Sequence, residues 1–278
     1  MLPLADITTE ALQPLVAGAA DLKPLIARWS EMESAIAEAV STAAARFRTE
    51  GRDPAQARFL PPVAPGKLIC VGVNYQDHID EMNITIDLPY PYCFSKPASN
   101  TLRGSGVTVT LPRNAEMFDW EAELAVVIGS SARDVLAREA LDHIAGYANF
   151  NDLSARDKLS TSSVVGVDWV FMKGQDGFGP IGPYLVPARF VPDPQALPVR
   201  LTVNGVTKQD SSTAEMVHGV AAIIEHLSSI MTLDPGDVIA TGTPAGTANG
   251  HSPIEWLKPG DEVVVEIGNL GQLVTPFA

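Results

Sequence analysis

Residues 118–129 read FDWEAELAVVIG, in which three acidic residues, Asp119, Glu121 and Glu123, stand directly before an unbroken apolar run. In a β-strand, residues i and i+2 share a face, so the pattern predicts that Glu121 and Glu123 point to one side and the residues between and beside them to the other. Two carboxylates on one face repel each other and raise at least one pKa unless a cation or hydrogen-bond donors lie nearby. The two glutamates therefore predict a cation or hydrogen-bond donors beside them.

Further strand patterns lie on both sides of this stretch. They are rich in Val, Ile and Thr and bounded by Gly and Pro, which is typical of short β-strands. They are KLICVGVNY (67–75), GVTVTLP (106–112), VRLTVNG (199–205), DVIATGTP (237–244) and DEVVVEIGNLG (261–271). Together with few helical crossovers, they predict an α+β, mainly β catalytic domain, rolled or barrel-like.

Helical patterns are concentrated at the amino-terminal end. Residues 1 to about 60 are Ala-rich, and EMESAIAEAVSTAAARFRTE (31–50) has apolar residues at helical spacing. A second helix is predicted over 213–231, and the proline-containing connector 57–68 is predicted to be extended. We expect a small α-containing segment, 1–65, followed by a catalytic domain, 66–278.

Composition excludes several classes of partner. The 278 residues have a formal net charge of −14, which disfavours nucleic acids and anionic membranes. The amino terminus lacks the basic start and apolar stretch of a secretory signal, no run approaches a membrane span, and the two cysteines have no metal-ligand spacing. We expect a cytoplasmic protein that acts on a small molecule.

A third carboxylate joins the glutamate pair. In YANFNDLSARD (147–157), an apolar strand-like segment leads to Asp152. Three carboxylates without Cys or His at ligand spacing favour Mg²⁺, Mn²⁺ or Ca²⁺ over Zn²⁺. The alternative is that Glu121 and Glu123 face solvent on an edge strand and that Asp152 is a turn or helix-capping residue.

A histidine and a glutamate are paired in NYQDHIDEM (74–82). His78 and Glu81 are three residues apart, so in a helical turn they share a face and Glu81 can orient His78 as a general base. A surface hydrogen bond is the alternative. His218 and His226 lie on the predicted helix 213–231 and are expected to be structural.

Eight segments together resemble the fumarylacetoacetate hydrolase family, in the family's order, over residues 66–278 and more than three quarters of the chain. They are VGVNYQDHIDEMN, FSKP, DWEAELAVVIG, AGYANFNDLSARD, MKGQDGFGPIGP, RLTVNG, MTLDPGDVIATGTPAG and LKPGDEVVVEI. The resemblance implies a mixed β-roll fold, usually a homodimer, with a divalent ion, Mg²⁺ or Mn²⁺, held by Glu121, Glu123 and Asp152.

The resemblance also implies roles for other residues. His78 and Glu81 match a catalytic dyad in a lid, and Lys173 matches a lysine that faces the bound substrate. Thr243 matches a residue that contacts the substrate carboxylate. Substrate contacts are further expected from Tyr75, Gln76 and Gln175. Many relatives have arginine where this chain has Gln76, which puts a distal substrate carboxylate in doubt, and Lys96 receives no role.

The leading hypothesis is a divalent-metal-dependent hydrolase that cleaves a carbon–carbon bond of a β-diketo or 2-oxo acid through an enolate. Its substrate would be of the acylpyruvate or fumarylpyruvate type, as found in aromatic catabolism. An oxaloacetate-type decarboxylase or a hydroxymuconate-type isomerase is the nearest alternative, since the same metal and enolate serve those reactions. The third hypothesis is a metal-stabilised dimer that has no catalytic activity and acts as a binding protein.

Overall fold

The computed structural model describes residues 12, 22–51, 53, 57–158 and 166–278. Its largest layer is a mixed seven-stranded sheet, in which β1 pairs in parallel with β11, β3 pairs in parallel with β8, and the remaining pairs are antiparallel. In spatial order the strands are β2 (Cys93–Ser95), β1 (Leu68–Val71), β11 (Val238–Ala240), β5 (Ala122–Ile128), β6 (Ile144–Asn151), β8 (Gly179–Pro187) and β3 (Leu102–Arg103).

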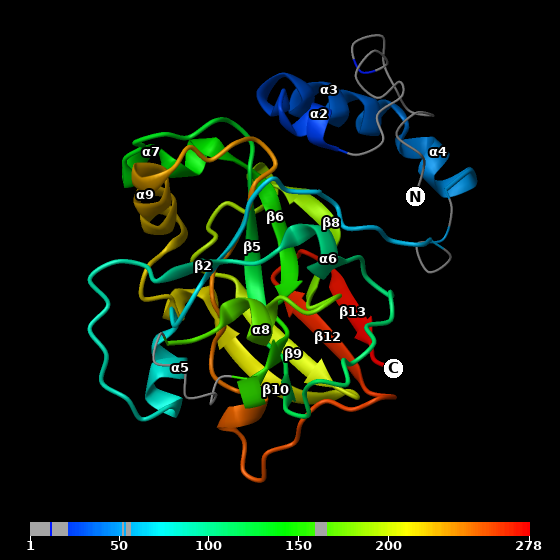
Figure 1. The fold of residues 1–278 in the computed structure, drawn as a ribbon. Coiled ribbons are helices and arrows are strands. Elements are labelled where there is room, and N and C mark those ends of the chain that lie inside the picture. Colours follow the sequence, from blue (N-terminus) through cyan, green and yellow to red (C-terminus); the bar gives the residue numbers. More distant parts are fainter. Residues whose placement is uncertain (1–11, 13–21, 52, 54–56, 159–165) are drawn as a thin grey trace.

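A second, four-stranded antiparallel sheet packs beside the first (Figure 1). Its order is β10 (Val206–Ser212), β9 (Pro198–Val203), β12 (Glu262–Ile267) and β13 (Gln272–Pro276). A short two-stranded pair, β4 (Phe118–Asp119) with β7 (Ser154–Ala155), lies between the ends of β5 and β6. This pair brings the chain before β5 next to the chain after β6.

The apolar run of β5 is unbroken because both faces of this strand are buried. Leu124, Val126 and Ile128 belong to the core that also contains β9, β12 and the helix α9 (Val220–Ile230). Ala125 and Val127 belong to a second core on the opposite face, which includes residues of β1 and β11. Alternate residues thus enter different cores, as period-2 alternation requires.

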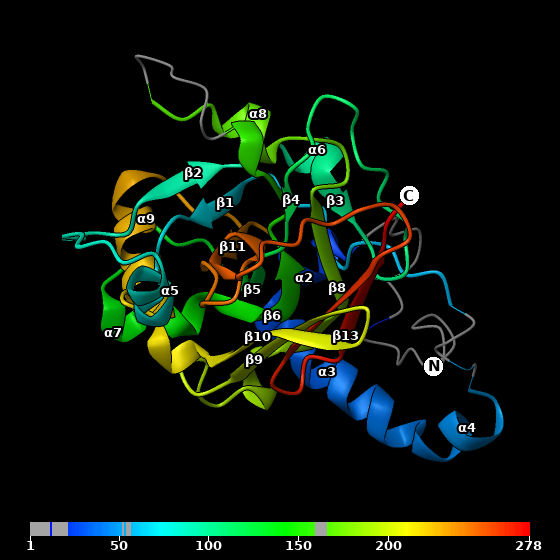
Figure 2. The same ribbon diagram turned by 90° about the horizontal axis from the view of Figure 1, so that it is seen from below.

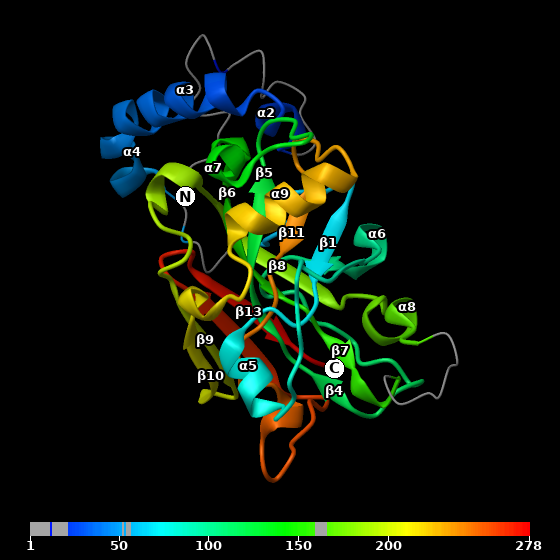
Figure 3. The same cartoon turned by 90° about the vertical axis from the view of Figure 1, so that its left-hand side faces the viewer.

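The helices lie around the sheets. α7 (Ala137–Ala140) contacts α9 at one edge (Figure 3), whereas α3 (Trp29–Thr42) and α4 (Ala44–Thr49) form an arm that lies far from α8 (Trp169–Lys173) in Figures 2 and 3. The remaining α-helices of the described residues are α2 (Lys23–Ile26), α5 (Gln76–Glu81) and α6 (Ala98–Thr101). Each described helix is too short or too polar to cross a bilayer.

The fold class is confirmed: the chain has a mixed, mainly β architecture with short helices toward its amino-terminal end. The expected helix over 31–50 is present as α3 and α4, and the connector has no helix or strand before β1 begins at Leu68. Expectations for residues 1–11 and 13–21 lie outside the described residues.

Two expected elements are wrong. Residues 106–112 form no strand of the sheets: they make one isolated bridge, Val109 to Phe277, and backbone hydrogen bonds from Gly106 and Leu111 to residues 274 and 278. The helix expected over 213–231 begins only at Val220, because Met216 bridges to Tyr75 and the backbone at Val217 donates to the Asn74 carbonyl. These contacts hold Met216 and Val217 against the chain that leads into α5, and Thr213–Glu215 before them form a separate 3₁₀ turn.

Candidate metal centre

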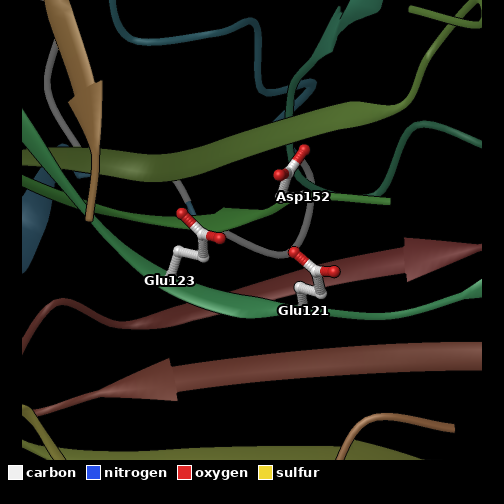
Figure 4. A group of neighbouring side chains, drawn as sticks. All are labelled: Glu121, Glu123 and Asp152. Atoms are coloured by element: carbon white, nitrogen blue, oxygen red, sulfur yellow. The ribbon is translucent and has the colours of Figure 1, made fainter. Parts of the chain in front are cut away.

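Three buried carboxylates converge at the junction of β5 and β6 (Figure 4). Glu121, Glu123 and Asp152 each offer one oxygen, and these oxygens all lie within 4.8 Å of one another. Glu121 is 5% exposed, Glu123 1% and Asp152 0%. The expectation that the three acids gather is confirmed, and the solvent-facing alternative is wrong because β5 is an interior strand with β11 and β6 on its two sides.

Strand pairing brings the acids together. Ala122 pairs with Asn151, so the start of β5 lies opposite the end of β6. The backbone N–H of Asp152 donates to the Glu121 carbonyl at 2.9 Å, which fixes the first residue after β6 beside the residue before β5. Because residues 121 and 123 share a face, both side chains reach the same space as Asp152.

Three cationic side chains surround these carboxylates. The Lys173 ammonium donates to Glu121 at 2.7 Å and to Asp152 at 2.5 Å. The Lys96 ammonium bonds the other Asp152 oxygen and two backbone carbonyls, and Arg156 donates to Glu121 at 2.5 Å and to Asp119 at 2.8 Å. Both lysines are almost fully buried, at 2% and 4% exposed.

The two glutamates have opposite pKa shifts. Burial alone would raise the pKa of Glu121, but the charges of Lys173 and Arg156 outweigh it and lower this pKa to about 2. Burial raises the pKa of Glu123 well above its ordinary value, and the negative charges of Asp152 and Glu121 raise it further. Among the described residues, Glu123 accepts a hydrogen bond only from the Gly242 N–H, at 2.9 Å, and the charge of Lys173 acts on it without a direct contact.

A divalent cation fits this donor set. Four buried carboxylates, those of Asp119, Glu121, Glu123 and Asp152, face three cations, so the fully ionised cluster has one excess negative charge. A divalent ion beside Glu123 would supply the opposite charge that this carboxylate lacks and leave the cluster with one excess positive charge. Oxygen-only ligands suit Mg²⁺ and Mn²⁺. A positive centre of this kind attracts an anionic ligand.

His78 and Glu81 form the expected pair on α5. His78 Nδ1 lies 3.2 Å from a Glu81 oxygen, and the other Glu81 oxygen accepts from the Gly246 N–H at 2.9 Å. Burial alone would raise the pKa of Glu81, but the hydrogen bonds from His78 and Gly246 lower it. Gly246 has φ +94°, and a Cβ there would lie 2.1 Å from the Lys208 carbonyl oxygen, so this anchoring amide requires glycine.

Two cavities meet at His78. The inner one, of about 190 Å³, is lined by His78, Glu121, Lys173 and Thr243 together with Arg156 and an apolar wall. The outer one, of about 660 Å³, shares His78, Met82 and Arg156 with it and extends to Trp256. The structure therefore brings His78, one of the three clustered carboxylates and Lys173 to one enclosed space.

The other residues expected at the site differ in their placement. Thr243 lines the inner cavity, although its hydroxyl donates to the Ala122 carbonyl and accepts from Gln209. Tyr75 is completely buried at the start of α5. Gln76 is exposed and donates to Asp80, and the Gln175 amide donates to the Phe171 carbonyl. Neither glutamine lines the inner cavity.

Sequence reasoning missed two site residues, Lys96 and Arg156. Lys96 follows β2, and Arg156 comes four residues after Asp152. No local pattern marks either residue as the partner of a buried carboxylate, although lysine and arginine are rarely buried unless they are paired. Outside the site, His226 stacks on Tyr90 and His218 lies beside Asn74, away from both cavities.

Three buried carboxylates beside an enclosed cavity define a class, that of proteins with a divalent-metal site built from acidic side chains. Comparison with known proteins shows the family within this class. Residues 67–278 match the family described as Fumarylacetoacetate (FAA) hydrolase C-terminal. The chain belongs to the fumarylacetoacetate hydrolase family.

The names of similar proteins in this family describe different reactions. The human mitochondrial oxaloacetate tautomerase FAHD2B is 42% identical over 217 residues, which cover 78% of this chain and 68% of that protein. A solved structure of 2-hydroxyhepta-2,4-diene-1,7-dioate isomerase from Mycobacterium marinum has a TM-score of 0.69 and 39% identity, covering 82% of this chain and 81% of that one.

A third similar protein was solved with ligands. Fumarylpyruvate hydrolase from Pseudomonas aeruginosa, in complex with Mn²⁺ and pyruvate, has a TM-score of 0.69 and 30% identity, covering 78% of this chain and 91% of that one. The relatives thus include an isomerase, a tautomerase and a hydrolase. Family membership alone leaves the reaction of this chain open.

Proposed function

We propose that this protein is a divalent-metal-dependent isomerase that moves a proton between the carbon next to the oxo group of a 2-oxo acid and the oxo oxygen. The observation that supports it is the pairing of one histidine base, His78, with Glu121 and Lys173 in the same inner cavity. Tautomerisation needs a base at the carbon and positive charge at the oxygen, and it needs no attacking water.

His78 is proposed as the base that removes the proton. Because the Glu81 carboxylate only accepts hydrogen bonds, His78 Nδ1 bears the proton of their contact, and Nε2 keeps a free lone pair. His78 is 9% exposed and lines the cavity, so Nε2 can face a substrate there. After accepting the proton, the imidazolium is stabilised by Glu81 and can return it to oxygen.

Positive charge at the oxo oxygen is proposed to come from two sources. When bound by Glu121, Glu123 and Asp152, a Mg²⁺ or Mn²⁺ ion supplies a Lewis acid at the substrate oxygens. Lys173 adds a second positive charge, because its ammonium already lies against two of these acids. Burial alone would lower the pKa of Lys173, but the negative charges of Asp152 and Glu121 outweigh it and raise this pKa. Arg156 and Thr243 line the same cavity and are proposed to bind the substrate carboxylate.

Hydrolysis of an acylpyruvate is the second candidate. The dyad His78–Glu81 supports it, since the same base can deprotonate a water, and the outer cavity of about 660 Å³ next to His78 has room for an acyl group. We also propose that the protein is a homodimer and that residues 66–278 are the catalytic unit, which follows the 1–65 segment.

Two measurements separate these reactions. Incorporation of solvent deuterium at C3 of oxaloacetate, followed by NMR with Mg²⁺, should exceed the rate with Mg²⁺ alone and should fall to that rate in His78→Gln. Acetopyruvate should yield no acetate and pyruvate. Release of both acids at a higher kcat/KM than the exchange reaction would favour the hydrolase, and exchange unaffected by His78→Gln would remove this histidine from the mechanism.

A further inference from the structure

Part of the wall of the inner cavity is apolar and aromatic. It is formed by Val71, Val73, Met82, Phe94, Trp169 and Met172. The Phe94 and Trp169 rings are stacked, with centroids 4.3 Å apart and an angle of 11° between their planes. The Trp169 indole N–H donates to the Tyr92 hydroxyl at 3.3 Å. This bond and the stacking hold the pair in place.

Phe94 lies close to the charged end of the cavity. The Lys173 ammonium is 5.4 Å from the centre of the Phe94 ring, and the same ammonium bonds Glu121 and Asp152. A 2-oxo acid whose carboxylate and oxo oxygens lie at this end has its C3 substituent next to Phe94. The substituent therefore meets the aromatic wall before it reaches solvent.

The cavity offers no separate cation for a second carboxylate. Among the described residues that line it, the side chains with a permanent positive charge are Arg156 and Lys173, and both are taken up at the head of the site. They pair with the clustered acids, and Arg156 is the proposed partner of the first substrate carboxylate. Gln76 is exposed and bonded to Asp80 rather than directed into the cavity. A charged distal group would lose its water without gaining a partner, which is costly.

From this wall we infer that the substrate is a 2-oxo monocarboxylic acid with an apolar, planar substituent at C3, of the arylpyruvate type. The inference rests on the proposed function for the reaction at C3, where the C3–H bond breaks and an O–H bond forms without any co-reactant. It adds that Phe94 and Trp169 determine specificity. A dicarboxylic oxo acid should be the weaker ligand.

Binding tests this inference independently of turnover. Isothermal titration with Mg²⁺ present compares pyruvate, phenylpyruvate and oxaloacetate. Burying a phenyl ring should make the Kd of phenylpyruvate about 10- to 100-fold lower than that of pyruvate. Phe94→Leu should raise the Kd of phenylpyruvate about 2- to 10-fold and leave that of pyruvate unchanged. Tyr90→Leu, which alters an exposed ring outside both cavities, serves as the matched control.

A second variant tests whether the cavity lacks a cation for a second substrate carboxylate. Met82→Arg places a guanidinium in the wall and should make oxaloacetate the tighter ligand of the two substituted acids. Tighter binding of oxaloacetate than of phenylpyruvate by the unaltered protein, or an equal effect of Phe94→Leu on pyruvate and phenylpyruvate, would overturn the inference. Tight, Phe94-dependent binding of phenylpyruvate without deuterium exchange at C3 would support the inference and contradict the proposed function.

Discussion

Replacing Gly250 with alanine should disable the dyad without unfolding the protein. A Cβ at this position would lie 2.1 Å from Glu81 Oε1 and 2.2 Å from Glu81 Cδ, so the carboxylate must move. Gly250 ends a 3₁₀ turn, Ala248–Gly250, and its φ lies outside the left-handed region, so alanine fits the backbone. The flexible end of Glu81 yields, and its 3.2 Å contact with His78 is lost.

The size of the effect follows from what the carboxylate does. Moving the carboxylate gives up its contact with His78 and its hydrogen bond from the Gly246 N–H, each of which contributes about 1 kcal/mol or more of unfolding free energy. A general base accounts for about 10²- to 10⁴-fold of rate, and a misplacement of about 1 Å costs about 10²-fold. We expect deuterium exchange at C3 to slow about 10²-fold, with a lower urea midpoint, a transition that stays cooperative and Mg²⁺ affinity preserved.

The exposed neighbour Asn249 provides the control. Asn249→Ala alters the same turn without adding an atom next to Glu81 and should retain the exchange rate. Glu81→Gln should be as slow as Gly250→Ala. If Gly250→Ala exchanges within about threefold of the unaltered protein while Glu81→Gln does not, the reasoning from the Cβ contact is refuted.

Three further predictions concern the buried charges. Glu123→Gln should abolish the rise in melting temperature on adding Mg²⁺ and leave the metal-free melting temperature nearly unchanged, because burial and the neighbouring acids raise the pKa of Glu123 and so disfavour its charged form when no metal is bound; a retained Mg²⁺ response would contradict the ligand set. Lys96→Met removes one buried partner of Asp152 and should lower the unfolding free energy by about 3–5 kcal/mol, measured by urea unfolding, whereas an unchanged midpoint would show that Lys173 suffices. The lowered pKa of Glu81 stabilises the fold at pH values above the ordinary glutamate pKa, and this contribution is lost as the pH falls through the lowered pKa. Glu81→Gln should therefore destabilise at pH 7, and this destabilisation should shrink as the pH falls through the lowered pKa; an effect that stays equal from pH 7 into the acid range would exclude this linkage.

The carboxylate cluster was accessible to sequence reasoning because strand alternation is a local rule. Glu121 and Glu123 must share a face wherever the chain is extended, and their charges demand compensation in any buried setting. The unbroken apolar run after them belongs to β5, which the structure shows to be buried on both faces. The pairing of Asp152 with this end of β5 followed from family resemblance and not from spacing.

Other features depend on contacts between segments that lie far apart in the sequence. A local sequence pattern carries no information on such contacts. The helix α9 begins late because Asn74, 144 residues away from His218, holds the chain there by hydrogen bonds. Residues 106–112 have strand composition, but their chain makes one isolated bridge, at Val109, and no strand of the sheets. Lys96 is buried against Asp152, 56 residues away, and its own flanking sequence says nothing of that partner.

The central claim is that Glu121, Glu123 and Asp152 hold a divalent ion to which a 2-oxo acid binds. Calorimetric titration of oxalate, a stable analogue of the carboxylate and oxo oxygens, into EDTA-treated protein with and without Mn²⁺ tests it most directly. The account predicts oxalate binding with Mn²⁺ and none detectable without it, and loss of both Mn²⁺ and oxalate binding in Glu123→Gln. Equal oxalate affinity in the presence and absence of Mn²⁺ would contradict it.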